Sequence, residues 1–182
     1  MDIQPVRKLV RLKDFDYRQS GLYFLTICSF RRSMIFGQIK NNQLEASLLG
    51  QLVRECWEEI PSHFPFVQLD AFVVMPNHLH GIIGFVSEKI PNELNVQGRS
   101  KKGSLGSVVG SFKAAVSRVY RANNKVNNPQ IWQRGYFEHV IRNENALDRI
   151  REYIVENPYR WDMDQDNPEA KKSDANFVRK ML

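Results

Sequence analysis

Two apolar segments separated by a Pro-Asn pair constrain the fold of this 182-residue chain more than any other feature. Residues 66–75 (FVQLDAFVVM) and 78–86 (HLHGIIGFV) are rich in β-branched and aromatic residues, which predicts two strands. Pro76 and Asn77 are turn residues, and the two strands are close enough along the chain to pair as a β-hairpin. The chain is therefore expected to contain an antiparallel sheet.

The other periodic segments add strands and helices around this hairpin. Two further strands are expected at 22–30 and 136–142, and apolar residues at helical spacing predict helices at 48–60, 104–121 and 143–157. Ser104 is suited to cap the second of these helices. This order predicts an α+β fold: a ferredoxin-like, RRM-like palm in which helices pack on one face of an antiparallel sheet.

The length fits one folded domain with polar ends. We expect a basic N-terminal segment at 1–20, the folded domain at 21–161, and a charged, loosely ordered tail at 162–182. Cys28 and Cys56 lie in apolar stretches without CxxC spacing, so they are expected to be buried free thiols.

The net charge of +6 and the sequence pI near 9.4 favour a polyanionic partner. Nucleic acid is the leading candidate, and an anionic membrane surface is the lesser one. The sequence contains no apolar run long enough to cross a bilayer, and the N-terminus lacks the apolar core of a signal peptide. The expected location is the cytoplasm, with no membrane partner.

The first candidate for chemistry is the pair His78 and His80. Side chains alternate along a strand, so the two imidazoles should point to the same face. Neutral histidine is a common ligand of divalent metal ions, although two histidines on a strand can also be hydrogen-bonded without a metal. Two ligands do not complete a site, so a third would have to come from another element.

The second candidate is the pair Tyr153 and Asn157 in the last predicted helix. Positions four apart share a helical face, so a tyrosine hydroxyl would project beside an amide oxygen able to bind a metal ion. Asn157 followed by Pro158 is equally consistent with an ordinary helix end. The residues alone leave both interpretations open.

Taken together, three segments resemble the REP-associated tyrosine transposases, which are relatives of the IS200-like transposases within the single-tyrosine HUH endonucleases. They are residues 75–80 (MPNHLH), 132–139 (WQRGYFEH) and 153–158 (YIVENP), in this order and at fitting separations. Phe112-Lys113 in the middle helix also matches, and the resemblance runs from about residue 11 to residue 161.

This resemblance implies a role for each matched residue. His78 and His80 match the metal-ligand pair of the family, and Tyr153 matches its nucleophile. Asn157 matches the third metal ligand, which is glutamine in some relatives, so the amide oxygen is kept with a shorter reach. The implied cofactor is a divalent ion, either Mg or Mn, and the family's ferredoxin-like palm agrees with the element order.

The implied reaction is metal-dependent cleavage and transfer of single-stranded DNA near hairpins of palindromic repeats, through a covalent 5′-phosphotyrosine intermediate. Family members act as monomers or as homodimers that share active sites, and both states stay open. Since phosphate neutralisation drives DNA affinity, cationic residues are the binding candidates. They are Arg7, Arg11, Arg31, Arg32, Lys101, Lys102, Lys113 and Arg118. The family's Phe-Lys pair singles out Lys113.

Three points remain open at this stage. A general base for the tyrosine is not evident, and Glu138 and His139 are candidates only through their position beside the predicted sheet edge. One alternative function is a non-catalytic nucleic-acid-binding domain on an RRM-like scaffold, which predicts metal-independent binding without cleavage. Another is a small metal-dependent hydrolase, which predicts nicks without a protein–DNA adduct.

Overall fold

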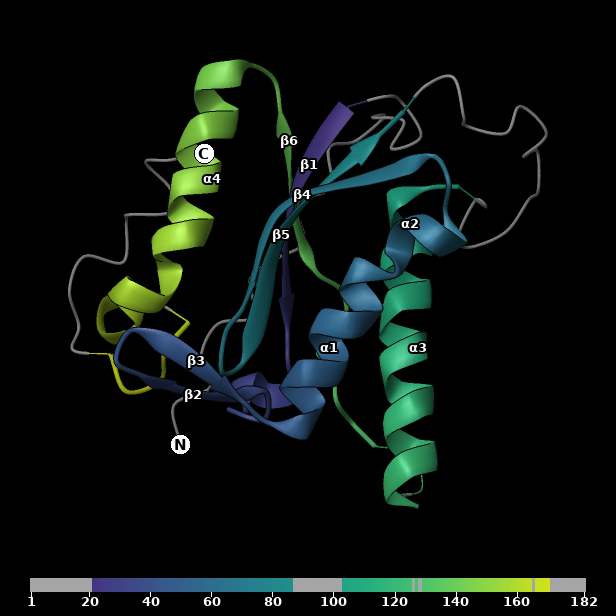
Figure 1. Cartoon of the computed structure of the whole chain (residues 1–182), viewed down its shortest axis with the longest axis vertical. Coiled ribbons are helices and arrows are strands. Elements are labelled where there is room, and N and C mark those ends of the chain that lie inside the picture. The colour runs from purple at the N-terminus through teal and green to yellow at the C-terminus, as the bar shows by residue number, and fades with distance from the viewer. Residues whose placement is uncertain (1–20, 87–102, 126, 128, 165, 171–182) are drawn as a thin grey trace.

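A four-stranded antiparallel sheet forms the centre of the computed structural model, which describes residues 21–86, 103–125, 127, 129–164 and 166–170 (Figure 1). The strand order is β4-β5-β1-β6, where β1 is Gly21–Cys28, β4 is Val67–Val74, β5 is His78–Phe85 and β6 is Phe137–Ile141. The predicted hairpin of β4 and β5 is confirmed, with Met75 N donating to His78 O at 2.8 Å across the turn. The central strands β1 and β5 are therefore paired on both sides.

Helices cover both faces of this sheet (Figure 1). Helices α1 (Leu48–Glu58) and α3 (Leu105–Asn124) pack on one face, as predicted, through Val53, Trp57 and Phe112. Helix α4 (Glu144–Glu156) lies on the opposite face, which corrects the expectation that the helices share one face. The antiparallel α+β class itself is confirmed.

The reason for the second helical layer is visible in β1. Tyr23 and Leu25 face α1 and α3, whereas Phe24 faces α4, and all three side chains are buried. A strand that is apolar on both sides needs cover on both sides. Helix α4 provides it by packing Leu147 and Ile150 against the Phe24 side of the sheet.

Side-chain caps set the starts of the three long helices. Ser47 accepts from Gly50 N at 3.0 Å, Ser104 accepts from Ser107 N at 3.3 Å, and Asn143 accepts from Ala146 N at 2.9 Å. The starts predicted at Ser104 and Asn143 are therefore confirmed. A short helix, α2 (Ile60–His63), follows α1, and Pro61 lies in its first turn.

A second hairpin, β2 (Gly37–Lys40) and β3 (Gln43–Ala46), was not predicted. Its turn residues, Asn41 and Asn42, have φ of 49° and 60°. Asparagine tolerates this left-handed region, which two-residue hairpin turns require. The Asn-Asn pair was thus a usable signal.

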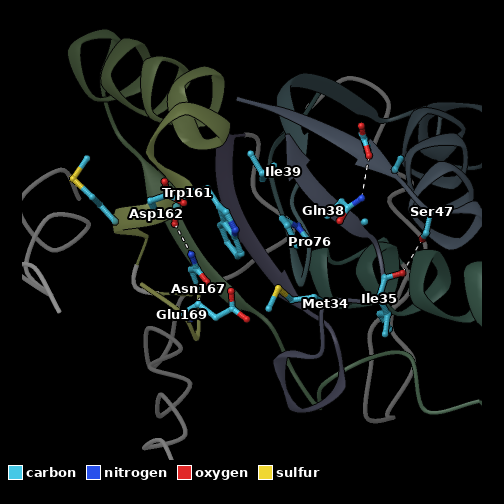
Figure 2. Close-up of a pocket in the computed structure, with 14 residues that line it drawn as sticks. Met34, Ile35, Gln38, Ile39, Ser47, Pro76, Trp161, Asp162, Asn167 and Glu169 are labelled. Atoms are coloured by element: carbon cyan, nitrogen blue, oxygen red, sulfur yellow. Dashed lines mark hydrogen bonds between the residues drawn. The ribbon is translucent and has the colours of Figure 1, made fainter. Parts of the chain in front are cut away.

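The chain after α4 folds back over the sheet instead of forming a loose tail up to Ala170. It continues as the 3-10 helix η3 (Asn157–Met163), and Asp164, Asp166 and Asn167 are buried. Figure 2 shows Trp161 and Asn167 of this segment lining an open pocket together with residues of the β2 region, among them Ile39. The expectation of loose order is therefore wrong for the described residues up to 170, because their polar groups find partners within the fold.

Within the described residues neither Cys28 nor Cys56 forms a disulfide, as expected, but both are partly exposed where full burial was expected. Among the helices in the described part of the chain, none is long and apolar enough to span a membrane.

Candidate active site

His78 and His80 lie side by side on β5, on the face that α4 covers. Their ring centroids are 4.4 Å apart, and the side chains are 0% and 2% exposed. The alternation of the strand places both rings on one face, as predicted from the sequence. Two buried imidazoles at this separation can approach a common ion.

Asn77 sets the tautomer of His78. The Asn77 amide nitrogen donates to two backbone oxygens, Asp166 O at 2.6 Å and Arg32 O at 3.3 Å. Its Oδ1 therefore faces His78 Nδ1, at 2.8 Å, and an amide oxygen can only accept. Nδ1 must carry the proton, so in the neutral imidazole Nε2 of His78 holds the lone pair that a metal ligand needs.

His80 lies between a hydroxyl of the sheet and the hydroxyl of Tyr153. Thr26, its direct partner on β1, places Oγ1 3.0 Å from Nδ1, and Tyr153 Oη lies 3.1 Å from Nε2. Phe24 stacks on the His80 ring at 5.3 Å and meets the Tyr153 ring edge-on at 6.1 Å. One aromatic residue of the core thus orients both functional rings.

Tyr153 and Asn157 enter the site from the end of α4. Tyr153 is 6% exposed and Asn157, at the boundary with η3, is 1% exposed. The Asn157 amide nitrogen donates to Asp164 Oδ2 at 3.1 Å. Within the described residues, Asn157 Oδ1 is buried without a hydrogen-bond partner. A buried polar atom in this state is costly, and a cation beside it would remove that cost.

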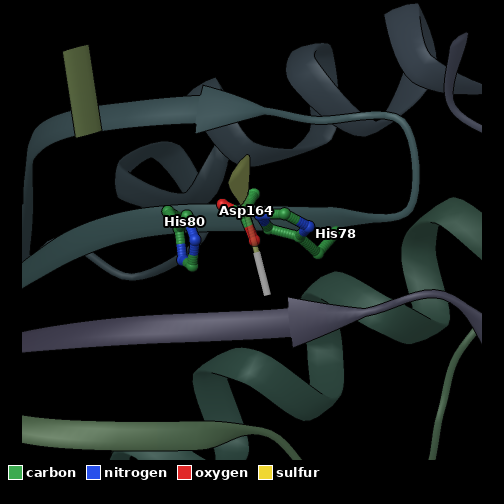
Figure 3. A group of neighbouring side chains, drawn as sticks. All are labelled: His78, His80 and Asp164. Carbon is green, nitrogen blue, oxygen red and sulfur yellow. The ribbon is translucent and has the colours of Figure 1, made fainter. Parts of the chain in front are cut away.

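Asp164 adds a carboxylate that the sequence analysis missed. One ligand atom from each of His78, His80 and Asp164 can be chosen so that all lie within 4.8 Å of one another (Figure 3). The Asp164 carboxylate is held by Asp166 N, which donates to Oδ1 at 2.6 Å, and by the Asn157 amide. Two imidazoles, an amide oxygen and a carboxylate form a donor set that fits a divalent cation.

No local pattern marked Asp164 in the sequence. It lies beyond the matched motifs, within a charged stretch that we interpreted as a tail, and only the return of the chain after η3 brings it to the histidines. The predicted boundary at residue 162 stays a prediction, and Asp164 shows that residues beyond it line the site.

The two sequence candidates for a general base, Glu138 and His139, lie on opposite sides of the sheet. Glu138 is paired with Leu25 on β1 and shares its side of the sheet, which faces away from α4. His139 is paired with Phe24 on the α4 side, and burial, followed by the nearby Arg142 charge, lowers its pKa. His80 Nε2 lies within hydrogen-bond distance of the Tyr153 hydroxyl, at 3.1 Å.

This geometry is found in a chain whose residues 22–157 match the family model "Transposase IS200 like". The chain belongs to the IS200-like transposase family. An uncharacterized protein of Haemophilus influenzae is 42% identical over 167 residues, covering 87% of this chain and 92% of its own. A candidate REP-associated tyrosine transposase of the same organism is 26% identical over 148 residues, covering 79% of this chain and 73% of its own.

A solved structure also resembles this transposase-family chain. It is a REP-associated tyrosine transposase bound to a REP hairpin, with a TM-score of 0.56 and 21% identity, covering 84% of this chain and 74% of its own. At this identity the likeness concerns the fold. The resemblance inferred from the sequence motifs is confirmed by the family match together with these relatives.

The predicted DNA-binding residues of this transposase-family chain differ in their surroundings. Arg31 and Arg118 are exposed, Arg32 pairs with the buried Asp166, and Lys113 is partly buried. Arg7, Arg11, Lys101 and Lys102 lie outside the described residues. The DNA-binding role of the whole set stays a prediction.

Lys113 makes contacts that hold a loop. Its Nζ donates to Gln133 O at 3.0 Å and to Gly135 O, and it lies 5.9 Å from the Trp132 ring. Burial lowers its pKa to about 8. These contacts fix the segment before β6, so any DNA contact of Lys113 would compete with them.

Gly81, which follows the second histidine, allows β5 to pack against α1. A Cβ on Gly81 would lie 2.4 Å from Cζ2 of Trp57, a buried side chain with 0% exposure. We expect Gly81→Ala to lower the free energy of unfolding by about 1–3 kcal/mol, because a filled core must shift to admit a methyl group. Urea denaturation followed by circular dichroism would measure the change.

The matched control is Gly110→Ala in the middle of α3, where an added Cβ meets no atom within 4 Å. Alanine is a better helix former than glycine, so the free energy of unfolding of this variant should rise by about 0.4–1 kcal/mol. Equal stability of the two alanine variants would contradict the packing account of Gly81.

Proposed function

We propose that this transposase-family chain is a metal-dependent endonuclease and strand transferase that cleaves single-stranded DNA near hairpins, with Tyr153 as nucleophile. The observation that carries this proposal is the position of Tyr153 Oη, 3.1 Å from His80 Nε2 in the site that also contains His78 and Asn157. A tyrosine beside a group of potential metal ligands is placed to attack a phosphate held by the same site.

The chemistry is a transesterification at phosphorus. Tyr153 Oη forms a bond to the scissile phosphorus while the bond from phosphorus to the 3′ oxygen breaks, leaving a 5′-phosphotyrosine and a 3′ hydroxyl. The phenol gives up its proton and the departing oxygen gains one, so the number of protons is unchanged. Because the ester bond is conserved in the adduct, attack by a 3′ hydroxyl can rejoin strands without ATP.

The residues that would hold the ion are His78, His80 and Asn157, with Asp164 as a further ligand. The buried oxygen of Asn157, which has no hydrogen-bond partner in the described part of the chain, supports this assignment. A bound Mg or Mn ion would supply positive charge that stabilises the phosphate and favours the phenolate, whose ordinary pKa is about 10. Asn77 and Thr26 would keep the imidazoles oriented.

The proposed substrate is a single strand that carries a hairpin of a palindromic repeat. A solved relative of the same fold is bound to a REP hairpin. The exposed Arg31 and Arg118 are suited to phosphate contacts. Since β5 and α4 of one chain bring Tyr153 to His80, a monomer can form the site, and a homodimer remains compatible with it.

The test is incubation with end-labelled hairpin oligonucleotides in Mg, in Mn or in excess EDTA, followed by a denaturing gel. The proposal predicts a shifted protein–DNA band that requires the metal ion. Metal-dependent nicks without that band would instead indicate a hydrolase. Tight, metal-independent binding without cleavage of any hairpin would favour a binding domain.

A further inference from the structure

A bulge in β4 places Asp70 outside the regular strand pairing. Leu69 pairs with Ile83 and Phe72 pairs with Gly81, so the two residues Asp70 and Ala71 lie where β5 supplies one residue, Ile82. Asp70 Oδ1 accepts from Ala71 N at 2.6 Å, which fixes the carboxylate within the bulge. Bulges re-aim a side chain at a defined point of a strand. In this chain the bulge lies opposite Ile82, which is two residues beyond His80 on β5.

The re-aimed carboxylate binds the helix that carries the proposed nucleophile. Arg151 of α4 donates Nε to Asp70 Oδ1 at 2.9 Å and Nη2 to Asp70 Oδ2 at 2.6 Å, in a two-pronged contact. Its remaining nitrogen lies 3.3 Å from Asp148 of the same helix. The hydrogen bonds from Arg151 are the largest cause of a lowered pKa at Asp70, so the carboxylate is ionised at neutral pH.

The Asp70–Arg151 pair fixes the orientation of α4 more than it stabilises the fold. The Arg151 and Asp70 side chains are 42% and 25% exposed, and ion pairs this open to water stabilise a fold little. The apolar contacts of α4, by contrast, are non-directional and allow the helix to rotate or slide on the sheet. A two-pronged guanidinium–carboxylate contact has a fixed geometry and does not allow that movement.

We propose that Asp70 and Arg151 form a positioning pair that sets the rotation of α4, so that Tyr153 Oη is held at the proposed metal site. The inference rests on the proposed function. It assigns neither residue a contact with DNA or metal. Loss of the pair should therefore lower the rate of tyrosine attack while leaving DNA affinity unchanged. Adduct formation is compared at saturating Mn, because Asn157, a proposed ligand, lies at the end of the same helix.

The test compares Arg151→Gln and Asp70→Asn with the charge-exchanged double variant Asp70→Arg/Arg151→Asp. Single-turnover adduct formation on a hairpin oligonucleotide should fall about 10–100-fold in each single variant, because small misplacement of a reacting group has effects of this size. The KM for the hairpin should stay within about twofold, and the exchanged pair should recover at least about tenfold of the lost rate. The control is Glu45→Gln, which removes the exposed Lys40–Glu45 pair of the β2–β3 hairpin and should leave the rate unchanged.

An unchanged rate in both single variants would overturn the inference. So would a fall in rate that follows the loss of melting temperature and is not rescued by charge exchange, since that describes a merely structural pair. If the unaltered protein forms no adduct with any hairpin, the proposed function fails first. The positioning claim is then decided by the nitrogen NMR chemical shift of His80 Nε2. In Arg151→Gln this shift should move toward its value in Tyr153→Phe. An unchanged shift would show that the pair does not position Tyr153.

Discussion

Tyr153→Phe is expected to reduce covalent DNA adducts at least about 10³-fold while changing hairpin affinity less than about twofold. The variant removes the only atom that would bond to phosphorus and keeps the ring that packs edge-on against Phe24. The hydrogen bond to His80 Nε2 is lost as well, but the imidazole keeps its contact with Thr26. Adduct is measured on denaturing gels and affinity by fluorescence anisotropy.

Tyr159→Phe and Tyr136→Phe serve as matched controls for this result. The Tyr159 side chain is 63% exposed, and Tyr136 packs against the core on the opposite side of the sheet, with α1 and α3. Both variants should form adduct at the rate of the unaltered protein. Adduct formation by Tyr153→Phe, or its loss in either control, would contradict the assignment of the nucleophile.

His78→Ala is expected to weaken Mn binding more than about 100-fold, since it deletes a proposed ligand of the ion. Asn77→Ala should weaken it by about 10–100-fold through a different route, because Asn77 fixes the protonated nitrogen of His78 without being a ligand itself. Titration calorimetry or the Mn EPR signal gives the affinity without requiring any DNA reaction.

The control for the metal experiment is His63→Ala at the exposed end of α2, which should bind Mn as the unaltered protein does. Asp164→Asn extends the series, because it keeps the shape of the side chain and removes its charge. We expect Asp164→Asn to bind Mn more weakly than the unaltered protein but more tightly than His78→Ala. Unchanged Mn affinity in His78→Ala would remove the proposed site, whatever the behaviour of the other variants.

The parts of this fold that could be predicted are those coded by neighbouring residues. The β4–β5 hairpin follows from two apolar strands around Pro76-Asn77, and the helix starts follow from the caps Ser104 and Asn143. The apolar run of β1 indicates that both faces of the sheet are covered. It does not indicate which helix covers which face, because that depends on packing between residues far apart in the sequence, such as Phe24 and Ile150 in one core cluster.

The candidate site likewise contains residues that could be predicted from local sequence patterns and residues that could not. Strand alternation and helical spacing placed His78 beside His80 and Tyr153 on the same helical face as Asn157. Asp164 and Asp166 reach the site only because η3 returns the chain to the sheet, where Arg32 and Asn77 contact Asp166. The bulge that aims Asp70 at Arg151 is a departure from regular pairing, and the alternating apolar pattern of β4 gives no sign of it.

The measurement that tests the central claim most directly is identification of the residue joined to DNA. The adduct with a hairpin oligonucleotide would be trapped in Mn, digested with nuclease and protease, and sequenced by tandem mass spectrometry. The account predicts a nucleotide joined through its 5′ phosphate to Tyr153. A nucleotide on another residue, a 3′-phosphate linkage, or cleaved DNA with no modified peptide would contradict it.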